Sequence, residues 1–144
     1  MQKKIYTHSP QETEAVGAEL ARGVHSPAFI ALYGDLGVGK TAFVRGFASV
    51  IAPGVAVRSP TFALVNEYRG KPYSVFHFDM YRITDEDELY SIGFYDYLER
   101  GICIVEWSEN IEYALPEEYI RIIIEKTDSD DENERLIVIE EIAK

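Results

Sequence analysis

The chain has 144 residues, a hydrophobic composition of 47% that suffices for the core of one domain over residues 1–144, and a formal net charge of −11. Its apolar runs all fall short of the roughly 20 residues of a membrane-spanning helix, and the N-terminal residues MQKKIYTHSP lack the apolar core of a signal peptide, so we expect a cytoplasmic protein without membrane contact. The single cysteine, Cys103, excludes an intramolecular disulfide and a multi-cysteine metal cage.

Apolar runs alternate with helical patterns along the first half of the chain. A helix is predicted over residues 11–23, where apolar side chains recur at helical spacing after a Ser-Pro pair that suits a helix start. The unbroken apolar run 28–33 predicts a strand that is buried on both faces. A glycine-rich segment, residues 34–39, separates this strand from an amphipathic helix predicted over residues 40–52.

The second half is predicted to contain mostly strands. Short helical stretches are expected only over residues 85–99, around Gly93. The predicted strands cover residues 64–68, 73–79, 102–105, 119–125 and 135–142. Such alternation of strands and helices is typical of a parallel-rich sheet with flanking helices, so the predicted fold class is α/β.

Residues 34–41, GDLGVGKT, fit the pattern GxxxxGK[ST] of a phosphate-binding loop. The glycines permit positive φ angles and a close backbone approach, so that successive N–H groups can face one anion. The helix that follows adds the positive end of its dipole. Lys40 supplies a charge for the β- and γ-phosphates, and the Thr41 hydroxyl suits a Mg²⁺ ligand. We therefore predict a nucleotide-binding site at this loop rather than an ordinary surface turn.

Two acidic residues end predicted strands. Glu106 follows the apolar run ICIV, and Asp79 follows VFHF. Ligands bind at the carboxyl ends of strands in open α/β sheets, so both carboxylates are candidates for the cation or catalytic group of a nucleotide site. Periodicity alone does not assign their roles, and either residue taken singly can be an ordinary strand-end acid.

Three further polar features have ordinary structural explanations. Ser59-Pro60-Thr61 falls between two strands, where a hydroxyl can sense a γ-phosphate, although a turn held by proline explains it as well. His77 is predicted to be a hydrogen-bonded core histidine, because no other histidine is near it in sequence. Trp107 can pack against an adenine or against the core, and the sequence leaves both open.

Several of these stretches together resemble the TsaE (YjeE) family of bacterial P-loop ATPases. They occur in the family's order and cover roughly half of the chain: GDLGVGKT (34–41), TAFVRGFA (41–48), RSPTFALVNEY (58–68), HFDMYR (77–82), GFYDYL (93–98) and VEWSE (105–109). The departures from the family pattern, at Val38, Ala42, Ala63 and Ser108, remove no phosphate-binding or metal-binding group.

The resemblance implies one P-loop NTPase-like domain with a mixed, mostly parallel central sheet flanked by helices, and ATP and Mg²⁺ as cofactors. It implies that Thr41 and Glu106 hold Mg²⁺, and that Lys40 and Asp79 are the catalytic residues, with Asp79 near the γ-phosphate. The N-terminal segment near Glu12 and Thr13 is also expected to approach the nucleotide. The residues expected to contact it are Thr13, Gly37, Val38, Gly39, Lys40, Thr41, Ala42, Thr61 and Arg135.

The family's role is ATP hydrolysis in support of the machinery that makes N6-threonylcarbamoyladenosine at tRNA position 37. The resemblance therefore implies TsaD-like and TsaB-like protein partners, and an ATPase with low activity in their absence. Residues 73–144 carry 6 basic and 20 acidic side chains. Because that half repels a phosphate backbone, we expect contact with tRNA only indirectly, through the partners.

Two alternative functions share the phosphate-binding loop. A small-molecule kinase usually needs a basic lid over the transferred phosphoryl group, and the basic residues after position 72 are spread singly. A nucleotide-gated binding module would use the nucleotide without useful hydrolysis. The sequence contains no Asn-Lys-x-Asp guanine motif, which favours adenine over guanine.

Overall fold

Seven strands form one sheet in the computed structural model, which describes residues 2–35, 37–60 and 64–143. The strands lie in the order β1-β7-β6-β2-β5-β4-β3. The strands are β1 (Gln2–Thr7), β2 (Ala28–Tyr33), β3 (Val65–Tyr68), β4 (Val75–Asp79), β5 (Ile102–Glu106), β6 (Glu118–Lys126) and β7 (Arg135–Ala143). The helices are α1 (Pro10–Gly23), α2 (Lys40–Ile51), α3 (Glu86–Ser91), α4 (Phe94–Tyr97) and the 3₁₀ helix η1 (Ser108–Ala114).

The sheet is parallel in its middle and antiparallel at both sides. β6, β2, β5 and β4 run parallel to one another, whereas β3 pairs antiparallel with β4, and β1, β7 and β6 pair antiparallel in turn. Short loops join β3 to β4 and β6 to β7, and such loops can join only antiparallel neighbours, whereas a parallel pair needs a longer crossover. The predicted mixed α/β fold is confirmed.

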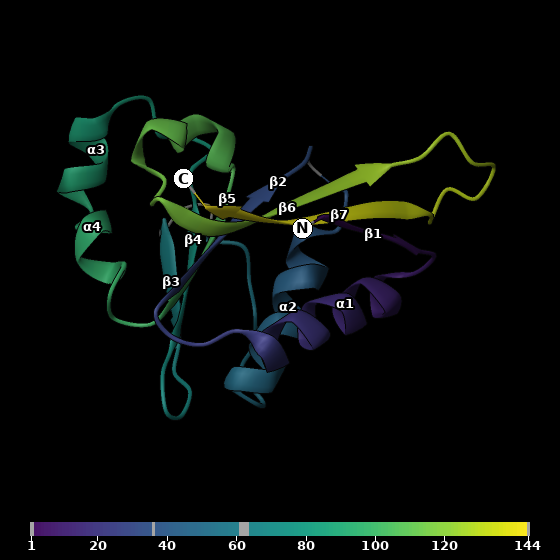
Figure 1. The fold of residues 1–144 in the computed structure, drawn as a ribbon, viewed down its shortest axis with the longest axis horizontal. Helices are drawn as coiled ribbons and strands as arrows, with labels where there is room; N and C mark the ends of the chain where they lie inside the picture. The colour runs from purple at the N-terminus through teal and green to yellow at the C-terminus, as the bar shows by residue number, and fades with distance from the viewer. Residues whose placement is uncertain (1, 36, 61–63, 144) are drawn as a thin grey trace.

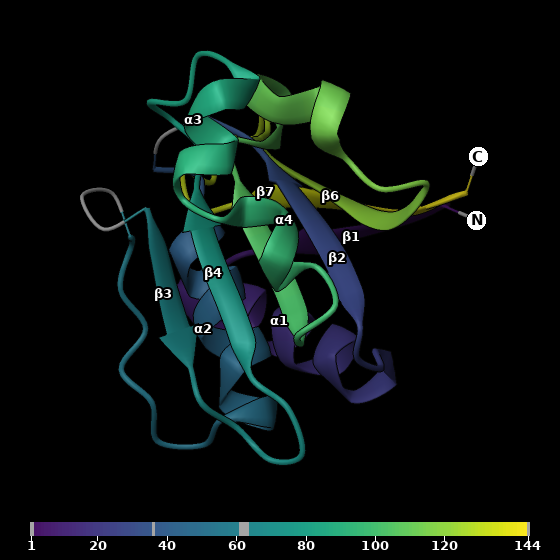
Figure 2. The ribbon, with the colours of Figure 1, turned by 90° about the vertical axis from the view of Figure 1, so that its left-hand side faces the viewer.

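Helices cover both faces of the sheet. α1 and α2 lie together on one face, whereas α3, α4 and η1 lie on the other (Figures 1 and 2). Strand alternation supplies a separate core to each face. In β2, Ile30 and Leu32 pack in the core under α1 and α2, while Phe29 and Ala31 pack in the core under the short helices. Among the described residues, no helix is both long and apolar enough to cross a membrane.

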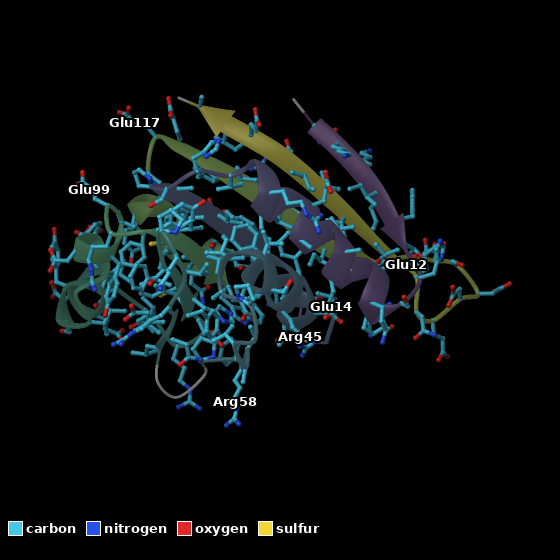
Figure 3. The ribbon with its side chains drawn as sticks, turned by 90° about the horizontal axis from the view of Figure 1, so that it is seen from below. Glu12, Glu14, Arg45, Arg58, Glu99 and Glu117 are labelled. Carbon is cyan, nitrogen blue, oxygen red and sulfur yellow. The ribbon has the colours of Figure 1, made fainter. Side chains whose placement is uncertain are left out.

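α1 and α2 touch through two glycines. A Cβ atom on Gly17 would lie 2.2 Å from the Phe43 carbonyl oxygen, and one on Gly46 would lie 1.8 Å from the Glu14 carbonyl oxygen. At the edge of the same contact, the Arg45 guanidinium lies 3.8 Å from the Glu14 carboxylate (Figure 3). This backbone contact fixes α2, and therefore the loop that precedes it, against the N-terminal segment.

We expect the substitution Gly46→Ala to lower the free energy of unfolding by about 1–3 kcal/mol, because the helices must separate to admit a methyl group. Gly23→Ala is the matched control, since its Cβ would meet nothing within 4 Å. Denaturant unfolding of both variants measures the difference. Equal stability of the two variants would contradict the close packing of α1 on α2.

The predicted helices and strands are confirmed to within two residues at their ends, but two elements were not predicted. β1 is an edge strand in which only Ile5 and Thr7 are shielded from solvent, so it lacks an apolar run. η1 follows Trp107, whose φ of 59° is rare for a non-glycine residue and reverses the chain after β5.

Candidate functional site

The phosphate-binding loop joins the end of β2 to the start of α2. Gly37 and Gly39 have φ angles of 78° and 112°, in the region that glycine adopts without strain. Gly39 is the residue before α2, and among the described residues no side chain caps the first N–H groups of that helix. The positive end of a 12-residue helix therefore remains available to an anion at this loop.

Lys40, the first residue of α2, bends back over the loop. Its Nζ donates a hydrogen bond of 2.6 Å to the Gly34 carbonyl oxygen and lies 4.2 Å from the centre of the Trp107 ring. The side chain is 5% exposed, and this burial lowers the Lys40 pKa, while the negative charges of Glu106 and Glu109 oppose the shift. The ammonium group thus occupies the concave side of the loop, close to acidic groups.

One cavity of about 560 Å³ contains the residues predicted to do the chemistry. It is lined by Gly37, Gly39, Lys40, Thr41, Ser59, Asp79, Tyr81, Glu106 and Trp107. Asp79 and Glu106 are directly opposite one another, because β4 and β5 are paired in register at these two positions. Both carboxylates are almost fully buried, at 6% and 4% exposure. The structure therefore brings Lys40, Thr41, Asp79 and Glu106 together, as the sequence predicted.

The two carboxylates are held differently. Asp79 Oδ1 accepts a 2.9 Å hydrogen bond from the Tyr81 backbone N–H, which turns the chain just after β4. Glu106 Oε2 lies 2.5 Å from His77 Nε2. His77 itself is fully buried and hydrogen-bonded through both ring nitrogens, as predicted for a core histidine. Its contact with Glu106 was not predicted.

The oxygens in this cavity suit a magnesium ion that is bound together with phosphates. Mg²⁺ prefers hydroxyl and carboxylate oxygens and is usually held by one or two carboxylates plus substrate phosphates. Thr41 and Glu106 offer such oxygens beside the loop. Within the described ranges, no cluster of three or more His, Cys, Asp or Glu side chains could hold a metal ion without such help.

A second, smaller cavity of about 140 Å³ also borders the loop. It is lined by Ser9, Pro10, Thr13, Gly37, Val38, Gly39, Ala42, Asn133 and Arg135. Arg135 Nε donates to the Val38 carbonyl oxygen at 3.0 Å, and the buried Thr13 hydroxyl lies 2.9 Å from the Thr7 hydroxyl. The structure thus brings Thr13 and Arg135, from opposite ends of the chain, to the loop.

Of the other residues predicted to approach the nucleotide, Glu12, Ser59 and Thr61, the structure places only Ser59 at a cavity described above. Glu12 is not among the residues that line either cavity. Its carboxylate accepts a 2.9 Å hydrogen bond from the His8 backbone N–H, just before α1. Ser59 lines the larger cavity, but Thr61 lies outside the described residues. Tyr81 lines that cavity with its ring 4.9 Å from that of Trp107, although sequence reasoning gave it no role.

Known proteins resemble this chain over nearly its whole length. The family model described as "Threonylcarbamoyl adenosine biosynthesis protein TsaE" matches residues 7–137. A Bacillus subtilis protein named tRNA threonylcarbamoyladenosine biosynthesis protein TsaE is 39% identical over 134 residues, which are 92% of this chain and 83% of the relative. A Haemophilus influenzae protein of the same name is 40% identical over 77% of this chain and 72% of its own. The crystal structure of Bacillus subtilis YdiB superposes with a TM-score of 0.81 and 32% identity, covering 99% of this chain and 87% of that one.

Proposed function

The chain belongs to the TsaE family of tRNA threonylcarbamoyladenosine biosynthesis proteins, and from that premise we propose that it binds Mg²⁺–ATP and hydrolyses it in support of this modification. One observation carries the proposal. The phosphate-binding loop, its lysine, the following threonine and two strand-end carboxylates line a single cavity of about 560 Å³.

In the proposed complex, the loop N–H groups and Lys40 hold the β- and γ-phosphates. Lys40 exchanges its hydrogen bond to the Gly34 carbonyl oxygen for phosphate oxygens, which carry full negative charge and bind an ammonium group more strongly. Thr41 and Glu106 hold the magnesium ion, which supplies positive charge to the phosphates when it is bound. The proposed complex therefore requires two oxygens and one ammonium group in the same cavity beside the loop.

Asp79 is the group that we assign to the attacking water. Its carboxylate is buried at the cavity wall, and one oxygen is already fixed by the Tyr81 N–H. A carboxylate held in this way can orient a water molecule and accept its proton as the water attacks the γ-phosphorus. The second cavity supports contacts to the rest of the nucleotide from Thr13 and Arg135.

We expect hydrolysis to be slow without partners. Fast phosphoryl transfer needs cationic groups around the γ-phosphate, and Lys40 is the one basic side chain among the described residues that line the larger cavity. TsaD-like and TsaB-like proteins are the partners proposed to complete the site. The partners, and not this chain, are also proposed to bind the tRNA, in the cytoplasm. The second half of this chain carries 20 acidic side chains against 6 basic ones and therefore repels a phosphate backbone.

Phosphate release tests the function directly. We expect the protein alone to release inorganic phosphate from ATP slowly without any acceptor molecule, and a TsaD–TsaB-like complex to accelerate release at concentrations where association is shown independently. Equal rates with and without the complex would contradict partner-dependent turnover. A requirement for an acceptor would instead identify a kinase, and normal tRNA modification with an Asp79→Asn variant that cannot hydrolyse ATP would identify a binding module. A Thr61→Ala variant tests the predicted γ-phosphate contact separately.

A further inference from the structure

A line of buried hydrogen bonds leads away from the larger cavity. Glu106 Oε2 lies 2.5 Å from His77 Nε2, and His77 Nδ1 lies 2.8 Å from the Tyr68 hydroxyl. The Tyr68 hydroxyl in turn lies 3.3 Å from the backbone nitrogen of Arg58 and 3.0 Å from its carbonyl oxygen. His77 is fully buried and Tyr68 is 3% exposed. The line thus joins a cavity carboxylate to the backbone beside Ser59, which lines the same cavity.

Three adjacent strands fix the geometry of this line. β3 pairs with β4 and β4 pairs with β5, and Tyr68 and Glu106 each lie two residues beyond the residue paired with His77, so both are diagonal neighbours of His77 in the sheet. Alternation within β4 places His77 and Asp79 on the same face of the sheet. The Tyr68 and His77 rings also pack together, with their centres 5.7 Å apart.

One assignment of hydrogen atoms connects Arg58 to Glu106 through a neutral imidazole, with the single Tyr68 hydroxyl proton placed on His77 and not on the Arg58 carbonyl oxygen. The Arg58 N–H donates to the Tyr68 oxygen, the Tyr68 hydroxyl donates to His77 Nδ1, and His77 Nε2–H donates to Glu106. All three donors then point toward the carboxylate. The negative charge at Glu106 polarises the whole line, because hydrogen bonds in a buried chain strengthen one another.

A space-filling role does not require these contacts. A core side chain at position 77 needs no ring nitrogens, and burying two of them is unfavourable unless both are hydrogen-bonded. Groups that hydrogen-bond a metal-ligating carboxylate or histidine fix its orientation. Arg58 itself is exposed and its side chain points away from the body of the protein (Figure 3), so Tyr68 engages it only through its backbone.

We propose that His77 is a positioning residue for the Glu106 carboxylate and that Tyr68 couples it to the backbone at Arg58, so that ligand binding in the cavity changes the conformation of the Arg58–Ser59 backbone. The inference rests on the proposed function in taking Mg²⁺–nucleotide as the ligand. Glu106 on β5 is thereby linked through β4 to Tyr68 on β3, and from there to the backbone at Arg58.

Two substitutions at His77 separate its contacts. A glutamine amide nitrogen can replace Nε2 and keep the hydrogen bond to Glu106. An asparagine amide reaches only as far as Nδ1, where its oxygen can accept the Tyr68 hydroxyl, so it keeps only the contact with Tyr68. Calorimetry measures ADP affinity with and without Mg²⁺. We expect His77→Asn to lose about tenfold or more of the gain in affinity that Mg²⁺ gives, and His77→Gln to keep most of it. Affinity without Mg²⁺ is expected to be unchanged in both.

The outcomes distinguish this inference from the proposed function. If the unmodified protein shows no Mg²⁺-dependent ADP binding, the proposed function fails and the inference fails with it. If Mg²⁺ strengthens ADP binding equally in the unmodified protein and in His77→Asn, only the positioning role is wrong. Equal losses in His77→Asn and His77→Gln would also overturn it, because they would indicate a general disturbance of the core.

Trypsin tests the link to Arg58, and it does so even if His77 variants fold poorly. Trypsin cuts after arginine, so the cleavage rate at the Arg58–Ser59 bond reports the release of the backbone that Tyr68 holds. We expect Mg²⁺–ADP to change this rate in the unmodified protein, relative to cleavage after Arg22, an exposed residue in the last turn of α1. Tyr68→Phe, which removes one hydroxyl, is expected to be cut faster and to lose the response to Mg²⁺–ADP.

Asn66→Ala is the matched control for that experiment. The Asn66 side chain also donates to the Arg58 carbonyl oxygen, at 3.0 Å. Asn66 is paired with His77 across β3 and β4 and also hydrogen-bonds Tyr68, but the contact with His77 Nδ1 is made by Tyr68. This variant is therefore expected to be cut faster at Arg58 while keeping its response to Mg²⁺–ADP. A normal nucleotide response in Tyr68→Phe, or no response in the unmodified protein that binds Mg²⁺–ADP, would overturn the coupling.

Discussion

Replacing Lys40 with alanine is expected to weaken ADP binding by about 30-fold or more, the equivalent of about 2 kcal/mol for a lost charge-assisted contact. The Lys40 ammonium group is buried within the larger cavity, close enough to Glu106 for their charges to interact. Without this ammonium group, the phosphates are repelled by the negative charges of Glu106 and Asp79. No other basic side chain among the described residues that line the cavity offsets that repulsion. Calorimetry in the presence of Mg²⁺ measures the change.

Lys71→Ala is the matched control for this prediction, since it removes the same charge from an exposed position in the turn between β3 and β4. Trp107 gives a second readout, because it is the single tryptophan of the chain and its ring lies 4.2 Å from Lys40 Nζ. If nucleotide binding draws Lys40 away from the Trp107 ring, adding nucleotide should change the tryptophan fluorescence of both the unmodified protein and Lys71→Ala. Unchanged ADP affinity in Lys40→Ala would show that the loop does not bind phosphates as proposed.

The central part of the fold could be predicted because its signals are local. β2 and β5 are apolar runs buried on both faces, and α2 carries an amphipathic pattern directly after a glycine-rich loop. Side-chain burial alone determines such elements. The two missed elements depend on distant contacts instead. β1 is stabilised as a strand by pairing with β7 along its length, and η1 is stabilised by the burial of Ile111 and Ala114 under the sheet.

The part of the site that lies at the ends of the parallel strands could be predicted from the sequence. Two adjacent parallel strands end at one edge, so the acids that follow them had to lie near the loop after β2. Thr13 and Arg135 carried no such signal, and only the family resemblance pointed to them. Their meeting at the smaller cavity depends on β1 and β7 lying beside each other at the edge of the sheet.

The contact between His77 and Glu106 was missed for a different reason. Seeing it requires the register of β4 against β5, which sequence spacing does not give. One signal was present, because His77 is two residues before Asp79 and therefore shares its face of the strand. A polar residue on the same face as a predicted site acid is a candidate neighbour of that site, even within an apolar run.

Removing the charge of either buried acid is expected to affect a different property of the protein, ATP turnover for Asp79 and Mg²⁺-dependent nucleotide affinity for Glu106. Asp79→Asn should lower ATP turnover by about 10²–10⁴-fold, the usual contribution of a general base, while leaving Mg²⁺–ADP affinity nearly intact. Glu106→Gln should instead remove most of the gain in affinity that Mg²⁺ gives, because the carboxylate is the proposed ligand. Single-turnover phosphate release and calorimetry with and without Mg²⁺ separate the two effects.

Amide substitutions are chosen because alanine would add a loss of core hydrogen bonding to the loss of charge. Glu106→Ala would leave His77 Nε2 without its acceptor in a fully buried position, whereas glutamine keeps a carbonyl oxygen there. Glu109→Gln is the control, since Glu109 contributes negative charge near Lys40 but lines neither cavity. It should leave turnover and the effect of Mg²⁺ close to those of the unmodified protein. If Asp79→Asn abolishes the Mg²⁺ effect and Glu106→Gln spares it, the two roles are exchanged, and His77 positions the catalytic carboxylate rather than the cation ligand.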